Sequence, residues 1–161
     1  MCAAALIIAG LPASADGFYA GFGFANVTAK EPGISVTSFN GIGLGGYEVN
    51  EYIAVEGEAS FVISEGSISG VGIGNKHMGA FVKFALPTSG AFTPHARLGY
   101  VKGTVTGSSG AASISLDETA FSYGIGAEYD FGSSSIRADY SAADFGVTES
   151  TILSITNVWK F

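Results

Sequence analysis

The chain has 161 residues, of which 47% are hydrophobic and only 13% are charged, about half the charge of an ordinary soluble domain. Its 14 acidic and 7 basic residues give a net charge of −7, which argues against nucleic-acid binding because that needs a basic surface. One cysteine excludes a disulfide scaffold and a cysteine-built metal site. The length allows a single domain, and no pattern in the sequence indicates a metal or a cofactor.

Residues 1–15 are predicted to be the end of a secretory signal peptide. An uncharged run of small and aliphatic side chains at 2–11 is followed by Pro12 and by Ala13-Ser14-Ala15, an A-x-A cleavage pattern. The run is too short for a membrane helix, which needs about 20 apolar residues. Since no positive segment precedes it, we expect the signal peptide to begin upstream of Met1 and the mature barrel domain to be residues 16–161.

From residue 17 onward the apolar residues recur with a period of two, which is typical of β-strands. In the run 53–61, for example, odd positions hold Ile53 and Val55, whereas even positions hold Glu56 and Glu58. A chain built this way can cross a membrane only as a closed barrel, because every backbone group must be hydrogen-bonded in lipid. The pattern predicts eight strands, at about 17–28, 38–48, 52–64, 76–86, 94–106, 119–131, 135–142 and 151–161.

The predicted connections alternate in length. Short ones lie near 48–51, 87–93 and 132–134, and long ones rich in Gly, Ser and Thr lie near 29–37, 64–75, 107–118 and 143–150. Short periplasmic turns and long extracellular loops are typical of up-and-down outer-membrane barrels. An even number of strands then places both ends of the barrel domain on the periplasmic side. The glycine-dense second strand does not show which of its faces points outward.

Two architectures fit this alternation. A membrane barrel turns apolar side chains to lipid and polar ones to the lumen, whereas a secreted lipocalin-like barrel does the reverse and binds a small apolar ligand. The ionic residues that share one face of their strands are Glu56, Glu58, Lys83, Arg97, Glu128, Arg137 and Asp139. Periodicity alone leaves both architectures open. The signal peptide, the unequal connections and the low charge favour an all-β, eight-stranded antiparallel transmembrane barrel, a monomer among outer-membrane lipids.

Several segments resemble the transmembrane domain of the OmpA family, an eight-stranded outer-membrane barrel. They are 45–56 (GGYEVNEYIAVE), 82–87 (VKFALP), 97–99, 126–129 and 136–140, and in order and spacing they cover nearly the whole mature chain. Apolar side chains alternate up to the C-terminus, which resembles the signal that barrel-assembly machinery recognises: Leu153, Ile155, Trp159 and Phe161. The resemblance implies a Gram-negative outer-membrane protein with a structural or surface-antigen role and at most a narrow gated pore.

The charged residues of the polar face are predicted to meet inside the barrel, because buried charges must be paired. Counting antiparallel register across the connections places Lys83 opposite both Arg97 and Glu56. It also places Arg97 opposite Glu128, and Asp130 opposite Arg137. In the OmpA family an interior ion-pair network is proposed to gate conductance, and the resemblance carries that role to four positions here. They are Glu56, Lys83, Glu128 and Arg137, with Arg97, Asp139, Glu58 and Asp130 beside them. The alternative is that the network only fills and stiffens the lumen.

An outer-membrane lipid-modifying enzyme is a third possibility, and it would need a histidine with a serine and a carboxylate. His77 and His95 are expected at opposite ends of the barrel, and no Gly-x-Ser-x-Gly segment is present. We therefore expect no catalysis and interpret each histidine as a hydrogen-bonded interior residue. Lys76 and Lys102 share the outward parity near the outer rim, where they either contact lipopolysaccharide phosphates or remain solvated.

Overall fold

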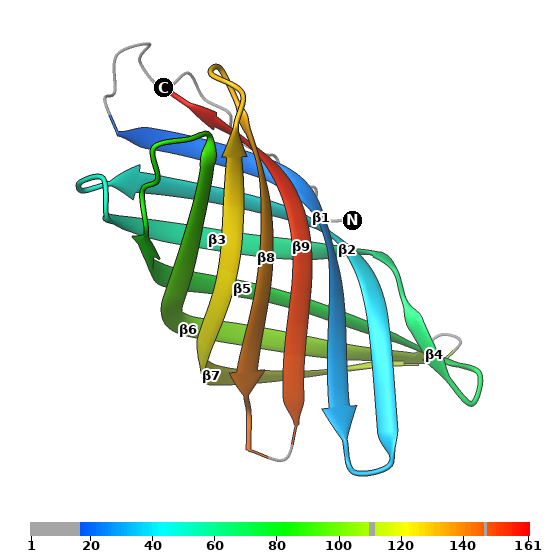
Figure 1. The fold of residues 1–161 in the computed structure, drawn as a ribbon. Helices are drawn as coiled ribbons and strands as arrows, with labels where there is room; N and C mark the ends of the chain where they lie inside the picture. Colours follow the sequence, from blue (N-terminus) through cyan, green and yellow to red (C-terminus); the bar gives the residue numbers. More distant parts are fainter. Residues whose placement is uncertain (1–16, 110–111, 147) are drawn as a thin grey trace.

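Hydrogen-bonded strand pairs run all the way around the molecule, which is a closed β-barrel in the computed structural model (Figure 1). The structure describes residues 17–109, 112–146 and 148–161, and the predicted signal peptide at 1–15 lies outside them. The strands are β1 (Phe18–Glu31), β2 (Ile34–Glu48), β3 (Ile53–Ser64), the short β4 (Gly66–Ile68), β5 (Val71–Ala85), β6 (Phe92–Ser109), β7 (Ala112–Asp130), β8 (Ser135–Asp144) and β9 (Glu149–Lys160). This part of the chain has no helix of the length and apolarity needed to cross a membrane.

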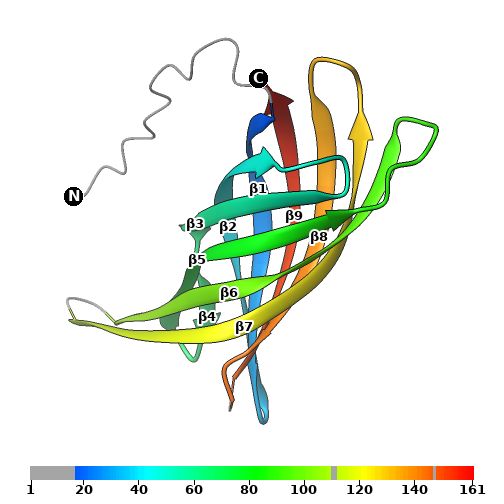
Figure 2. The same cartoon turned by 90° about the vertical axis from the view of Figure 1, so that its left-hand side faces the viewer.

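The eight long strands are antiparallel to their neighbours in the order β3-β2-β1-β9-β8-β7-β6-β5. Pairing of β5 with β3 closes the ring, so the prediction of an eight-stranded up-and-down barrel is confirmed. β1 begins and β9 ends at the end of the barrel that carries the turns 49–52, 86–91 and 131–134 (Figure 2). We call this the periplasmic end, because short turns face the periplasm in such barrels.

At the opposite, extracellular end the strands run further than predicted. The described residues of 29–37, 64–75 and 107–118 are largely strand, and β1–β2, β4–β5 and β6–β7 form hairpins that project beyond the ring (Figure 2). β8 and β9 each run two residues further towards the extracellular end than predicted. Gly33 and Gly70 have φ values of +83° and +84° and allow the tight reversals of two of these hairpins. The prediction ended the strands early because Gly, Ser and Thr are common in loops. Here they alternate with β-branched residues that continue the extended conformation.

A band of aromatic and aliphatic side chains surrounds the outside of the barrel. Its members have exposed fractions between 38% and 67% and include Phe22, Phe24, Phe61, Tyr123, Ile125, Tyr140, Leu153 and Ile155. A continuous apolar surface of this kind matches the hydrocarbon of a bilayer. On β2, Ile42 and Leu44 point inward, whereas Gly41, Gly43 and Gly45 lie at the outward positions, which settles the orientation that the sequence left open. The ring of Phe61 covers Gly41, where a Cβ would overlap it.

Candidate functional site

The centre of the lumen is occupied by an ion pair that joins opposite walls of the barrel. Arg137 of β8 donates to both carboxylate oxygens of Glu56 on β3, with Nη1–Oε1 and Nη2–Oε2 distances of 2.5 and 2.9 Å. Three strands separate β3 from β8 in either direction around the ring, so this pair lies across the full width of the lumen. Both side chains have 0% exposure to solvent.

Asp139 extends this pair towards β6. Its carboxylate accepts hydrogen bonds from Arg137 Nε at 2.7 Å and from His95 Nε2 at 2.8 Å. Because a carboxylate only accepts, His95 Nε2 carries a proton in this contact. The space comes from Gly126, where a Cβ would lie 2.5 Å from His95 Nε2 and 2.6 Å from Asp139 Oδ1. A side chain at this position would therefore push His95 and Asp139 apart.

A second cluster forms around Glu58 of β3. Arg97 on β6 donates to both Glu58 oxygens at 2.6 and 3.1 Å, and His77 Nε2 lies 2.9 Å from Glu58 Oε1. Arg97 Nε also donates to Ser141 Oγ on β8 at 3.0 Å. Its Nη1 lies 3.9 Å from Glu56 Oε2, which connects the two clusters into one.

Lys83 on β5 is held less tightly than the two arginines. Its Nζ lies 3.5 Å from Glu56 and 3.7 Å from Glu128, longer than an ordinary hydrogen bond. It also lies 4.7 Å from the centre of the Tyr19 ring. The Tyr19 hydroxyl donates to Glu56, and Glu128 accepts from Ser135 Oγ at 2.5 Å. Lys83 is therefore a cation placed between two carboxylates without a short bond to either.

Together these side chains form what we call the lumen network, and all of them are withdrawn from water. Their side-chain exposures are 9% or less. An isolated buried charge would be very costly, and pairing with hydrogen bonds offsets that cost. The network consists of the carboxylates Glu56, Glu58, Glu128 and Asp139, the cations Lys83, Arg97 and Arg137, and the imidazoles His77 and His95. Within the described residues no group of His, Cys, Asp or Glu is arranged to hold a metal ion.

The predicted register is correct for one strand pair and wrong for the others. Lys83 does lie opposite Arg97. However, Ala54 rather than Glu56 lies opposite Lys83, and Gly124 rather than Glu128 lies opposite Arg97. The predicted centres of the connections from β3 to β5 and from β6 to β7 are off by one and two residues. The long side chains of Glu56 and Lys83 still bring their charged groups together.

Asp130 does not join the lumen network. Glu128 is the residue opposite Arg137, and Asp130 pairs with Ser135 nearer the periplasmic turn. Its exposed side chain accepts a hydrogen bond from the Gly132 backbone N–H at 2.5 Å, and Gly132 has a φ of +96°. Asp130 therefore stabilises a turn.

Both histidines belong to the lumen network, which the sequence does not predict, although each shares the inward parity of a network cation on its own strand. A serine beside His77 is not predicted either. Ser60 Oγ lies 2.9 Å from His77 Nδ1, while Glu58 contacts Nε2. The same oxygen accepts from the His77 backbone N–H at 2.9 Å and from the Asn40 side-chain amide at 3.2 Å. Its lone pairs are thus used for hydrogen bonds within the wall.

The remaining predicted residues lie on the outer face. Lys76 and Lys102 are exposed on neighbouring strands, and Lys102 Nζ forms an ion pair with Asp117 at 2.8 Å. The alternating C-terminal residues all face outward, with exposed fractions from 43% to 62%: Leu153, Ile155, Trp159 and Phe161.

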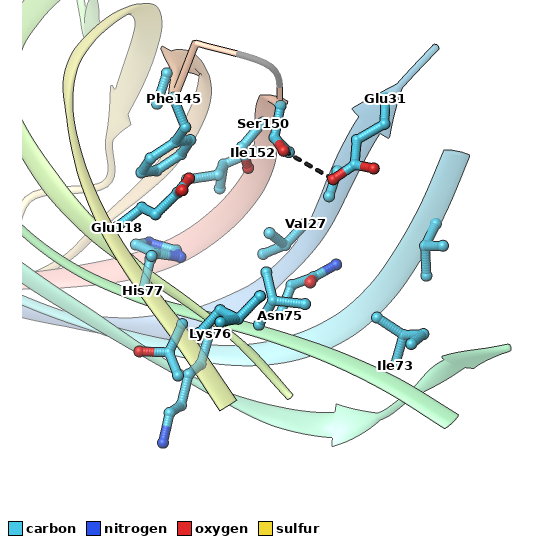
Figure 3. Close-up of a pocket in the computed structure, with 18 of the residues that line it drawn as sticks. Val27, Glu31, Ile73, Asn75, Lys76, His77, Glu118, Phe145, Ser150 and Ile152 are labelled. Atoms are coloured by element: carbon cyan, nitrogen blue, oxygen red, sulfur yellow. Dashed lines mark hydrogen bonds between the residues drawn. The ribbon is translucent and has the colours of Figure 1, made fainter. Parts of the chain in front are cut away.

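The lumen network separates two cavities. The cavity at the periplasmic end has a volume of about 210 Å³ and is lined by Lys83, Glu128 and residues of the turns. The cavity at the extracellular end has a volume of about 380 Å³, and His77 lies on its inner side (Figure 3). A charged and hydrogen-bonded plug therefore lies between the two ends of the lumen.

Comparison with known proteins agrees with this architecture. Residues 1–161 match the family model described as outer membrane protein beta-barrel domain. The chain belongs to this family. Members of the outer membrane β-barrel family sit in the outer membrane, which is the location of this protein. A comparison with curated proteins finds no match.

Solved structures of other outer-membrane barrels share the fold. Neisserial surface protein A is 17% identical, with a TM-score of 0.76 over 91% of this chain and 98% of that one. Ail, the attachment invasion locus protein of Yersinia pestis, solved in complex with a heparin analogue, is 19% identical, with a TM-score of 0.69 over 91% and 99%. The N-terminal barrel domain of Pseudomonas aeruginosa OprF is 11% identical, with a TM-score of 0.58 over 86% and 97%. The secreted lipocalin-like alternative is not favoured.

Proposed function

We propose that this protein is a surface-exposed outer-membrane anchor whose lumen is plugged, and that it conducts at most briefly through rearrangement of the lumen network. The observation that carries the proposal is the bidentate pair between Arg137 and Glu56, which crosses the lumen between opposite strands. A channel through this level would have to separate two buried charges, each of which would then lack its partner. The closed state is therefore strongly preferred.

Lys83 is the part of the plug best suited to move. Arg137 and Arg97 each hold a carboxylate through two hydrogen bonds, whereas Lys83 is shared at 3.5 and 3.7 Å between Glu56 and Glu128. A shift of its ammonium towards Glu128 would loosen the contact with Glu56 without leaving the cation unpaired. Lys83 also lines the periplasmic cavity, so this movement would open the plug from that side.

Currents across planar bilayers test the proposal. Refolded residues 16–161 are inserted, with folding checked by the heat-modifiable band on a gel. We expect the wild-type barrel to remain closed apart from brief small steps, and Lys83→Ala to change the frequency of those steps several-fold at matched insertion. Lys102→Ala is the matched control, because it removes a lysine from the outer face and should leave the currents unchanged.

Two results would contradict the proposal. Steady, large conductance of the wild-type barrel would show that the lumen network does not close the lumen. Identical currents for the wild type and Lys83→Ala would remove the gating role and leave only a filled, stiffened lumen.

We propose no catalytic role for the contact between Ser60, His77 and Glu58. Glu58 is shared with Arg97, and the Ser60 oxygen already accepts two hydrogen bonds from the wall. Ser60 is also absent from the lining of both cavities described above. The contact is better explained as part of the packing of the lumen network.

The proposal for assembly rests on the outer face of β9. Trp159 and Phe161 are 43% and 46% exposed and lie near the periplasmic end of the barrel. Together with Leu153 and Ile155 they form an alternating series of outward-facing apolar residues. This series supports the proposal that barrel-assembly machinery recognises the C-terminal strand. We propose that the mature barrel is a monomer, since its apolar outer face is suited to lipid.

A further inference from the structure

The alternation of side chains is inverted at the extracellular end of the barrel. Along β6, the lumen-facing positions change from Arg97 to Val105, while the outward positions change from Leu98 to Lys102. The same inversion occurs on other strands. The inward positions hold Val27, Val36, Ile73, Leu116 and Ile152, and outward positions of the same strands hold Thr28, Thr37, Lys76, Asp117 and Thr151.

This inversion indicates that the extracellular end is built for water outside and apolar contacts inside. A strand places successive residues on opposite faces, so several hairpins must exchange polar for apolar residues at about the same height. Contact with lipid cannot explain the inward valines and isoleucines, because they do not face lipid. The extracellular end thus has the polarity of a soluble ligand-binding barrel on top of a membrane barrel.

The inward apolar side chains do not fill the space that they surround. The extracellular cavity of about 380 Å³ is lined by side chains from every long strand except β3, and Figure 3 shows Val27, Ile152 and Phe145 directed into it. This volume is within the range of pockets that hold small molecules. Leu116, on its rim, is 68% exposed, and apolar surface left open in this way is typical of a binding site.

The floor of the cavity carries one polar group without a partner. Asn75 is 4% exposed, and neither its side-chain oxygen nor its side-chain nitrogen has a hydrogen-bond partner among the described residues. Its backbone oxygen already accepts from Ser38 Oγ and from Asn40 Nδ2, at 3.2 and 2.6 Å. A buried amide without partners is costly. A ligand group that both donates and accepts, such as a hydroxyl or an amide, would satisfy it.

The charges around the cavity determine which head group fits. Glu31, Glu118 and Lys76 line it, but the side chain of Lys76 points away from Val27 and Asn75 (Figure 3). Glu31 accepts a hydrogen bond from Thr148 at 2.9 Å. These carboxylates repel an anionic head group, and an ionised group of either sign at the buried floor would lose its hydration. An uncharged polar group is therefore preferred.

We infer that the extracellular cavity binds a small, uncharged, single-chain amphiphile, with its hydroxyl or amide group at Asn75 and its alkyl chain along the apolar wall. The site lies on the extracellular side of the lumen network and shares His77 with it. It gives the protein a ligand-binding activity at the cell surface in addition to its role as an anchor.

Methyl NMR of the barrel in lipid nanodiscs tests this inference, with 1-octanol as the probe. Methyl groups of Val27, Val101 and Ile152 report on the cavity, and those of Ile125 and Leu153 report on the lipid-facing surface. We expect saturable shifts at the cavity methyls at octanol concentrations that leave the lipid-facing methyls almost unchanged. Octanoate should bind at least about tenfold more weakly, because its charge is disfavoured in the cavity.

Three variants make the test specific. Ala29→Trp fills the cavity and should abolish the saturable shifts, whereas Thr28→Trp places the same side chain on the outer face and should keep them. Asn75→Leu should weaken octanol binding by about fivefold, the effect of one hydrogen bond. The heat-modifiable band shows whether each variant is folded.

Three outcomes would overturn the inference. In the first, cavity and lipid-facing methyls shift together without saturation, which means partition into lipid. In the second, Ala29→Trp keeps the shifts of the wild type. In the third, octanol and octanoate bind equally well to both the wild type and Asn75→Leu, which would remove the polar recognition at the floor.

Discussion

Arg137 and Glu56 show at the scale of single residues why the lumen is closed. Their side chains have 0% exposure to solvent and share two hydrogen bonds. Arg137 also binds Asp139 through Nε at 2.7 Å, so its guanidinium compensates two buried carboxylates. Removing this one cation would leave both carboxylates in a low-dielectric interior, which is much more costly than the net value of the intact pair.

Arg137→Ala is therefore expected to lower the free energy of unfolding by about 3–5 kcal/mol. Urea unfolding of the barrel in lipid vesicles, followed by Trp159 fluorescence, measures it. Lys160→Ala is the control, because Lys160 forms an ion pair with Glu48 at 3.0 Å on the surface, where such a pair contributes at most about 1 kcal/mol. Equal losses for the two variants would contradict a buried, mutually dependent network.

Which residues share the lumen could be predicted from parity, whereas their partners could not. Lys83 and Arg97 were placed opposite each other because the connection between their strands is short. The partner of Arg137 is Glu56 from the far wall, and a contact across the barrel leaves no trace in the register of neighbouring strands. His77 was missed for a related reason: its partners Glu58 and Ser60 are identified only once the shear of β3 against β5 is known.

At the scale of strands, glycines determine how closely the backbones of neighbouring strands can approach each other. Gly23 of β1 faces the lumen beside β9, and a Cβ at this position would overlap the backbone oxygen of Ile155. Backbone cannot move aside as a flexible side chain can. By contrast, Gly57 of β3 faces outward, and a Cβ there would meet nothing within 4 Å.

We expect Gly23→Ala to destabilise the barrel by about 1–3 kcal/mol, the usual cost of overpacking. Gly57→Ala should be neutral or slightly stabilising, since alanine loses less conformational freedom than glycine in a strand. The midpoints of urea unfolding in the same vesicles compare the two. A larger loss for Gly57→Ala would show that the space at the two glycines does not control stability.

The central parts of the strands were predictable from the sequence, and their extracellular ends were not. Alternation identifies a strand wherever one face is consistently apolar, as in the run around Val55. Near the outer edge of the lipid the apolar face of each strand changes from outward to inward. A search for apolar residues at the same alternate positions therefore does not recognise the strand beyond this point. Leu116, for example, belongs to β7, although the sequence predicts a loop at its position.

At the scale of the whole molecule, three zones are stacked along the barrel axis. The periplasmic cavity, the lumen network and the apolar extracellular cavity follow one another, and an apolar band for lipid surrounds the barrel. The extracellular hairpins and connections carry three basic and six acidic residues. The basic residues are Lys30, Lys76 and Lys102, and the acidic ones are Glu31, Glu65, Asp117, Glu118, Asp144 and Glu149. This balance disfavours sulfated polyanions as partners and restricts contacts with phosphates to places where lysines gather.

Lys76 and Lys102 are such a place, and we propose that they contact lipopolysaccharide phosphates at the outer edge of the lipid. They lie on adjacent strands and face outward, just above Met78 and Tyr100 of the apolar band. The competing partner is Asp117, whose carboxylate is 2.8 Å from Lys102 Nζ. The hydrogen bond from Lys102 lowers the pKa of Asp117 below its ordinary value, so Asp117 is ionised at neutral pH and holds Lys102 against the protein.

Two variants with opposite expected effects therefore test this contact. The Lys76→Ala/Lys102→Ala double variant should lose most of the acceleration that lipopolysaccharide gives to folding into vesicles, because both charge-assisted bonds to phosphate are removed. Asp117→Asn should increase the acceleration several-fold, because it releases Lys102. Lys30→Ala removes an outward lysine from β1 and serves as the control. Folding is followed by the heat-modifiable band with and without lipopolysaccharide. If all four proteins show the same acceleration, the two lysines are merely solvated and phosphate binds elsewhere or not at all.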